Sequence, residues 1–237
     1  MNRWKSQVNN AIIDTCIAII KEPLIYFSES DVQQLLCENL QNIKTFSKMY
    51  RTSLNRGKNS GSFFKTSMLH REYGGGKGTR IDIVVFHPKQ LREINNPNLT
   101  NDGAYLKPMI AFELGTEKTI NALAHYKSDI SKLKKASDSG YLIHIYKDIT
   151  KSRKGTPSRN NTEVKIQSKF KDVFEKNNVS NIKIKVLAIL LRTYVNQERM
   201  IGKCEIFDRE SKEWKKVNVS KNADIRIAIE KQLTNNF

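Results

Sequence analysis

The sequence predicts an α/β protein with a mixed central β-sheet flanked by helices. Stretches with the 3.6-residue apolar period of a helix alternate along the chain with short apolar runs typical of strands. The expected elements follow one another in the order ααβββαβαβ, which favours a layered α/β fold. The chain has 237 residues, of which 38% are hydrophobic, and this is enough for the core of one domain.

The expected helices have apolar residues three and four positions apart and lie at 4–22, after Ser28, at 119–136, at 162–177 and at 221–234. The helix after Ser28 starts with Ser-Glu-Ser-Asp, which fits a capping box. The expected strands are short apolar runs at 67–73, 80–86, 108–114, 141–147 and 182–191, with a further hairpin near 199–217. Residues 44–66 fit neither pattern and are expected to form a basic loop.

We expect one domain over residues 1–237. Its core would span about residues 24–178, with an N-terminal helix in 1–23 and a C-terminal elaboration over 180–237. In the expected helix 119–136 the polar side, typical of a solvent-facing surface, is formed by Asn121, His125, Asp129, Lys132 and Lys135.

The three cysteines are odd in number and have no CxxC spacing, so neither a zinc cluster nor a disulfide framework is expected. The first residues lack the apolar core of a signal peptide. No apolar run reaches the roughly 18 residues needed to cross a bilayer. We therefore expect a cytoplasmic protein without a membrane partner.

Positive charge is the strongest global signal. The 41 Lys and Arg residues exceed the 24 Asp and Glu residues, which gives a net charge of +17. Such a field attracts polyanions, so nucleic acid is the expected partner; an anionic membrane surface and a basic surface kept for solubility are the alternatives. The cations expected to contact nucleic acid are Lys44, Lys48, Arg51, Arg56, Lys58, Lys77, Lys132, Lys151, Arg153 and Lys154.

Residues 74–79, Gly-Gly-Gly-Lys-Gly-Thr, contain the residue types of a phosphate-binding loop but not their order. Gly78 separates Lys77 from Thr79, and a strand follows where the loop would need a helix N-terminus. We expect a hairpin turn that places Lys77 beside a nucleic-acid backbone.

Two carboxylates stand out because each interrupts an apolar strand. Asp82 lies within Ile-Asp-Ile-Val-Val-Phe, and Glu113 lies within Met-Ile-Ala-Phe-Glu-Leu. A half-buried carboxylate costs free energy unless a cation balances it, and two on neighbouring strands raise each other's pKa. Mg²⁺ suits such a pair, and Mn²⁺ is expected to substitute for it. In the alternative interpretation, Arg80 and Lys118 neutralise these acids as surface ion pairs.

These segments resemble the PD-(D/E)XK, or restriction-endonuclease-like, nuclease superfamily. The similarity rests on Arg-Ile-Asp-Ile-Val around Asp82, on Ile-Ala-Phe-Glu-Leu-Gly around Glu113, and on the helix and strand that follow, over about residues 24–148. It implies an αβββαβ core in which Asp82 and Glu113 ligate Mg²⁺. Glu29 corresponds to the helical acid that some members add, and Glu72 is a further candidate.

The family's motif lysine belongs two residues after the second acid, where this chain has Gly115. In the family that lysine helps to orient the attacking water. We expect Lys118 to replace it, with Lys127 or Lys132 of the following helix as alternatives.

The resemblance implies a Mg²⁺-dependent DNA endonuclease that hydrolyses phosphodiester bonds. By family analogy alone it would be a type II restriction enzyme or a phage-defence nuclease, with a homodimer as one way to cut both strands. The alternative is a catalytically inactive nuclease-fold module that binds DNA within a larger complex, for which Gly115 is the best sequence evidence. A nuclease acting on RNA is the third possibility.

Overall fold

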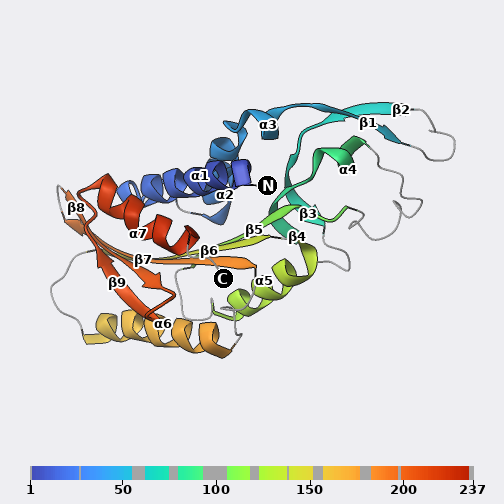
Figure 1. Ribbon diagram of the computed structural model, residues 1–237. Helices are drawn as coiled ribbons and strands as arrows, with labels where there is room; N and C mark the ends of the chain where they lie inside the picture. Colours follow the sequence, from blue (N-terminus) through green and yellow to red (C-terminus); the bar gives the residue numbers. More distant parts are fainter. Residues whose placement is uncertain are drawn as a thin grey trace.

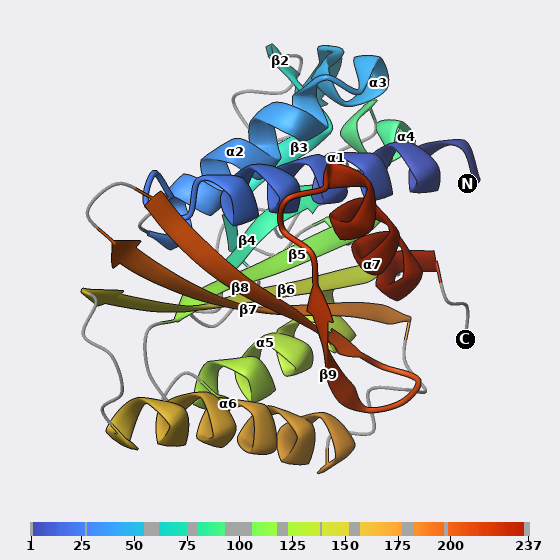
Figure 2. The same cartoon turned by 90° about the vertical axis from the view of Figure 1, so that its left-hand side faces the viewer.

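A seven-stranded β-sheet lies between two layers of helices, as the sequence predicts (Figure 1). The structure, a computed structural model, describes residues 2–26, 28–54, 62–74, 80–92, 106–117, 123–137, 139–151, 157–176, 183–196 and 199–234. The helices of the two layers are α1 (Asn2–Lys21), α2 (Glu29–Gln41), α5 (Leu123–Ala136), α6 (Pro157–Lys176) and α7 (Asn222–Thr234). Figure 2 shows α1, α2 and α7 on one face of the sheet and α5 and α6 on the other.

The sheet combines antiparallel and parallel pairs. Its strands, in spatial order, are β3 (Leu69–Gly74), β4 (Arg80–Val85), β5 (Ile110–Glu117), β6 (Gly140–Lys151), β7 (Ile184–Asn196), β8 (Arg199–Asp208) and β9 (Glu213–Val217). β5, β6 and β7 run parallel, and the other neighbouring pairs are antiparallel. Parallel neighbours need a crossover, and α5 and α6 lie within the two crossovers. The order α2–β3–β4–β5–α5–β6 is the expected αβββαβ order, with short additions before β3 and before β5.

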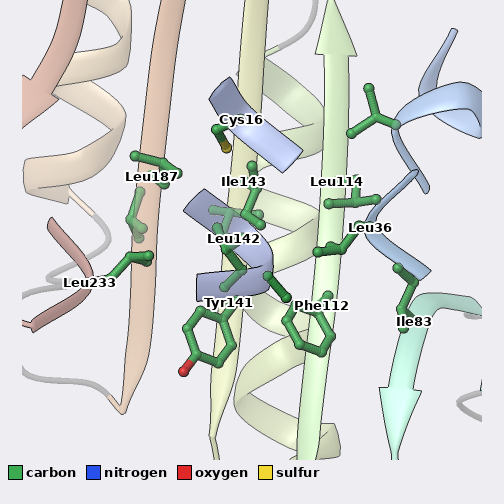
Figure 3. Packing of buried hydrophobic residues seen from close by; sticks show 14 of the residues in the cluster. Cys16, Leu36, Ile83, Phe112, Leu114, Tyr141, Leu142, Ile143, Leu187 and Leu233 are labelled. Atoms are coloured by element: carbon green, nitrogen blue, oxygen red, sulfur yellow. The ribbon is translucent and has the colours of Figure 1, made fainter. Parts of the chain in front are cut away.

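The side chains of β5 alternate between the two helical layers. Phe112 and Leu114 are buried on the side of α1 and α2, where Leu36 of α2 lies beside them (Figure 3). Phe112 stacks on Tyr141 of β6, with their ring centroids 5.1 Å apart. Because successive side chains of a strand point to opposite faces, Glu113 faces the layer that contains α5.

Helix α2 is capped and fastened to the β3–β4 hairpin. The predicted capping box is confirmed, since Ser28 Oγ accepts a hydrogen bond from the Asp31 amide and Asp31 Oδ2 accepts one from the Ser28 amide. Gln33 is buried and donates from Nε2 to the Asp82 carbonyl oxygen at 2.7 Å and to Glu72 Oε1 at 2.9 Å. The start of α2 is thereby held close to Asp82.

The expectation of a loop over residues 44–66 was wrong in part. β1 (Tyr50–Leu54) and β2 (Ser62–Thr66) form a separate two-stranded antiparallel sheet, which we call the β1–β2 arm. Tyr, Thr and Phe residues favour strands, and the Gly-, Ser- and Asn-rich stretch between them suits a hairpin connection. In Figure 1 the arm extends away from the central sheet, with the short helices α3 (Lys44–Ser47) and α4 (Pro88–Arg92) near its inner end.

The C-terminal elements β8, β9 and α7 continue the same sheet and cover it. The buried Asp208 carboxylate joins them, because it pairs with Lys231 of α7 at 3.0 Å and with Lys215 of β9. Arg226 of α7 also pairs with Asp14 of α1 at 2.6 Å. The division into a core and a C-terminal elaboration over residues 180–237 stays a prediction. Over the residues that the structure describes, no helix is both long and apolar enough to cross a membrane.

Candidate active site

Asp82 and Glu113 occupy neighbouring positions on β4 and β5. The antiparallel pairing of these strands ends at Ile83 and Phe112, and Asp82 and Glu113 are the next residues in that register. The ladder is replaced there by a side-chain contact, since Asp82 Oδ2 accepts a hydrogen bond from the Leu114 amide at 2.6 Å. The two carboxylates predicted from the sequence are therefore brought together.

Burial and mutual repulsion make both carboxylates poor anions. Burial and the Asp82 carboxylate raise the pKa of Glu113, and the hydrogen bond from Lys132 opposes this rise. Burial also raises the pKa of Asp82 to about 7, although the hydrogen bond from the Leu114 amide lowers it. Two adjacent carboxyl groups of this kind retain a proton near neutral pH unless a further cation offsets their charge.

Lys132 of α5 reaches across to Glu113. Its Nζ lies 2.9 Å from Glu113 Oε2 and 2.9 Å from Asp129 Oδ1. The sequence predicts Lys132 as a contact to nucleic acid and, as an alternative, as a replacement for the motif lysine. The structure brings it to the second acid of the motif, and a contact to nucleic acid stays a prediction.

Asp129 and His144 complete this group, and neither was predicted as a functional residue. Asp129 belongs to the polar side that the sequence predicts for its helix, yet this residue is only 6% exposed. Its Oδ2 lies 3.3 Å from Nε2 of the buried His144. Burial raises the pKa of Asp129, but the hydrogen bonds from His144 and Lys132 bring it below its usual range. The spacing of Asp129 and Lys132, three residues apart on one helix side, was the available sequence signal.

Gly115, the position at which the resemblance would place a lysine, lies directly against His144. The two residues are partners in the parallel register of β5 and β6. A Cβ atom on residue 115 would lie 2.8 Å from both Cε1 and Nδ1 of His144. A side chain at this position is therefore incompatible with the His144 ring in its present place.

One oxygen of the buried Glu113 carboxylate is unsatisfied. Glu113 Oε1 and His144 Nδ1 are buried and have no hydrogen-bond partner among the described residues. An unpaired buried polar atom costs free energy, and carboxylate oxygens suit a hard cation such as Mg²⁺. Across the described ranges, no group of three or more His, Cys, Asp or Glu side chains is arranged to hold a metal ion. A cation here would depend on Asp82 and Glu113, with water or phosphate oxygens as further ligands.

The other predicted acids differ in their relation to this group. Glu29 lies in the first turn of α2, and partial burial together with the Asp129 carboxylate raises its pKa. Glu29 therefore stands near the acidic group, and its role as an added acid stays a prediction. Glu72 instead binds Gln33 of α2, and its backbone has a φ of 50°, so its side chain is directed away from the regular strand position.

Comparison with known proteins gives no functional assignment. No family model and no curated protein matches the chain. Among solved structures, the chain is similar to the central domain of yeast acetyl-CoA carboxylase, with 10% sequence identity and a TM-score of 0.31. The match covers 86% of this chain and 28% of that one. Such a similarity carries no argument, so the functional proposal depends on the geometry of the site.

The predicted nucleic-acid contacts are described only in part. Lys44, Lys48 and Arg51 are exposed at α3 and at the start of the arm. Six predicted residues lie outside the described part of the chain: Arg56, Lys58, Lys77, Lys118, Arg153 and Lys154. Lys151 is the last residue of β6, and its side chain is not described.

A basic surface nevertheless surrounds Tyr50 at the base of the arm. Two cations lie against the Tyr50 ring. Lys48 Nζ lies 5.9 Å and Arg92 Cζ lies 5.6 Å from its centre. Lys65 and Lys89 are exposed on the neighbouring β2 and α4. The segments α3, β1, β2 and α4 contain no Asp or Glu. We call Lys44, Lys48, Arg51, Lys65, Lys89 and Arg92 the arm cations.

Proposed function

We propose that this chain is a metal-dependent DNA endonuclease of the restriction-endonuclease-like superfamily. One observation carries the proposal. The buried Glu113 carboxylate lies next in register to Asp82 and has one oxygen bound to Lys132, while its other oxygen has no partner among the described residues. This group contains the two acids and the lysine that phosphodiester hydrolysis of this type needs, with the lysine supplied by α5.

Each residue has a role that follows from its chemistry. Asp82 and Glu113 would hold Mg²⁺, or Mn²⁺ in its place, and offset its charge. A bound divalent cation of this kind polarises a phosphodiester and lowers the pKa of a coordinated water. Lys132 would donate a hydrogen bond to the attacking water or to the phosphate and stabilise the negative charge that develops there. Glu29, at the edge of the group, would add a further carboxylate.

The partner we propose is double-stranded DNA. The net charge of +17 and the arm cations support an attraction to the phosphate backbone, which requires no particular base sequence. A homodimer would bring two sites to the two strands of a duplex. A role in restriction or phage defence rests on family analogy alone.

A second candidate is a DNA-binding module without chemistry. The ion pair between Lys132 and Glu113 favours it, because this pair offsets the buried charge of Glu113 without a metal. In such a module Gly115 would mark the loss of the motif lysine instead of its relocation.

Plasmid cleavage distinguishes the two candidates. We expect wild-type protein to nick or linearise supercoiled plasmid with Mg²⁺ or Mn²⁺ and to leave it intact with EDTA. Asp82→Asn, Glu113→Gln and Lys132→Met should each lower the cleavage rate by a factor of about 100 or more. Lys135→Met, which removes an exposed lysine from the same helix, is the matched control and should leave the rate unchanged.

Binding measured by fluorescence anisotropy completes the test. Tight binding of duplex DNA without cleavage under any metal condition would support the binding module and refute the nuclease. Competition of labelled duplex DNA with RNA of the same length identifies the preferred nucleic acid. Cleavage that persists in both acid variants would place the chemistry elsewhere.

A further inference from the structure

Lys132 is held by two carboxylates at once. A lysine side chain is long and flexible, and fixing it in one geometry costs rotamer entropy. Here Nζ donates to Glu113 Oε2 and to Asp129 Oδ1, each at 2.9 Å. An ammonium group has three donors, so one N–H remains for a ligand.

Asp129 is itself fixed by a second contact. Its Oδ1 accepts from Lys132, and its Oδ2 lies 3.3 Å from His144 Nε2, so each oxygen has a different partner. Asp129 is 6% exposed, and no residue contact of Lys132 other than those with Asp129 and Glu113 is found among the described residues. Its two contacts make Asp129 the link between strand β6 and Lys132.

The surroundings of His144 leave its ring little freedom. One side of the ring lies against Gly115, and Tyr126 of α5 makes an edge-to-face contact with ring centroids 5.6 Å apart. Tyr146 lies two residues further along β6, with its ring centroid 6.1 Å away. The residue is 1% exposed and therefore cannot turn towards solvent without moving its neighbours.

We propose that Asp129 and His144 are positioning residues that hold the Lys132 ammonium group beside Glu113. This inference rests on the proposed function, because the aligned ammonium group matters for the hydrolysis of a phosphodiester. In this arrangement His144 orients Asp129, and Asp129 shares the Lys132 ammonium group with Glu113, each at 2.9 Å. Without Asp129, Lys132 would pair with Glu113 alone and neutralise the carboxylate that the metal needs.

Isosteric variants test this arrangement. Asp129→Asn keeps the shape of the side chain and removes its charge, and we expect kcat to fall about 10- to 100-fold, the range found for residues that orient the groups of a metal site. KM for duplex DNA should stay within a factor of about two, because neither residue binds the substrate. The same variant should weaken Mn²⁺ binding, measured by titration calorimetry without DNA, about tenfold or more.

The His144 end is tested by two variants of different donor capacity. His144→Gln can place its amide nitrogen near the position of Nε2, so it should keep kcat within about threefold of wild type, whereas His144→Leu should lower kcat as Asp129→Asn does. Asp172→Asn, at an exposed position of α6, is the matched control for the loss of a helical carboxylate. Thermal unfolding of every variant shows whether a loss of kcat comes from a misplaced Lys132 or from an unfolded protein.

The outcomes separate this inference from the proposed function. Unchanged kcat and Mn²⁺ affinity in Asp129→Asn, while wild-type protein cleaves DNA, would overturn the inference alone. Equal losses in His144→Gln and His144→Leu would also overturn it, because the donor would then be irrelevant. Wild-type protein that neither cleaves DNA nor binds Mn²⁺ would overturn the proposed function and this inference together.

Discussion

The ring of His144 fills the space into which a side chain at Gly115 would extend, with 2.8 Å between the Cβ position and two ring atoms. Gly115 is thus one half of a complementary pair with His144, and the lysine that reaches Glu113 comes from α5. Under the proposed function, this pair would exclude a motif lysine at residue 115, and Lys132 would take its role.

The first prediction concerns this pair. Gly115→Ala should lower the free energy of unfolding by about 1–3 kcal/mol, because the ring must shift within a packed interior. Urea denaturation measures the change. In a His144→Ala background the same substitution should cost clearly less, since the obstructing ring is gone. Equal costs in the two backgrounds would show that the contact does not limit residue 115.

The second prediction concerns the pH dependence of stability through Asp82. Its folded-state pKa of about 7 lies above its ordinary value of 3.8, so the folded state binds the proton more tightly than the unfolded state. This contribution to stability is present below pH 3.8 and is lost as the pH rises towards about 7, by about 1.4 kcal/mol for each unit of pKa difference. Wild-type protein in EDTA should therefore lose stability relative to Asp82→Asn between pH 4 and 7.

Denaturation curves of both proteins at pH 4, 5.5 and 7 measure this difference. Under the proposed function, Mg²⁺ should stabilise wild-type protein at pH 7 and leave Asp82→Asn nearly unchanged, because the metal binds the ionised carboxylate. A pH-independent difference between the two proteins would contradict the assignment of a raised pKa to Asp82.

The third prediction concerns the attachment of α2 to the hairpin. Gln33 is buried and bonded to the Asp82 carbonyl oxygen, to Glu72 and to Arg71. Gln33→Ala should lower the free energy of unfolding by about 1–3 kcal/mol, because it removes the packing of a buried side chain and the hydrogen bond to the part-buried Asp82 carbonyl oxygen. Gln34→Ala, at the exposed neighbouring position, is the control and should change it by less than about 0.5 kcal/mol. Similar values for the two variants would show that α2 is not held through Gln33.

The fourth prediction concerns the arm cations. Lys48→Gln and Arg92→Gln should each weaken duplex DNA binding and lower the slope of log K against log salt by about 1, since each removes one phosphate contact. Anisotropy titrations in EDTA at several salt concentrations measure this without cleavage. Lys171→Gln, at an exposed position of α6, is the control. An equal effect of all three variants would indicate attraction by overall charge without a defined surface.

Most elements of the fold could be predicted because their apolar periods are long and regular. The strand around Asp82, for example, extends over Arg80–Val85 where the sequence predicts 80–86, and the last helix over Asn222–Thr234 where it predicts 221–234. β1 and β2 were missed because each is five residues long and rich in polar and basic residues, which mask a strand pattern.

Prediction of the site was limited by contacts between distant segments. Asp82 and Glu113 were found because a carboxylate within an apolar strand is a local signal. His144 gave no such signal, because its role depends on partners 15 and 29 positions away, Asp129 and Gly115. For Asp129, the helix period correctly predicts the polar side of α5. It does not predict that His144 of β6 lies against this carboxylate and buries it.

The contact between α1 and α7 bears on how the chain reaches its folded state. Arg226 and Asp14 are separated by 212 positions, and the inner face of α1 packs beside α7. Closing so long a loop costs conformational entropy before the contact can offset it. Contacts between such distant segments therefore lower folding rates. During synthesis, α1 lacks part of its packing surface until α7 has left the ribosome. We therefore expect α1 to dock late, only after α7 has been synthesised.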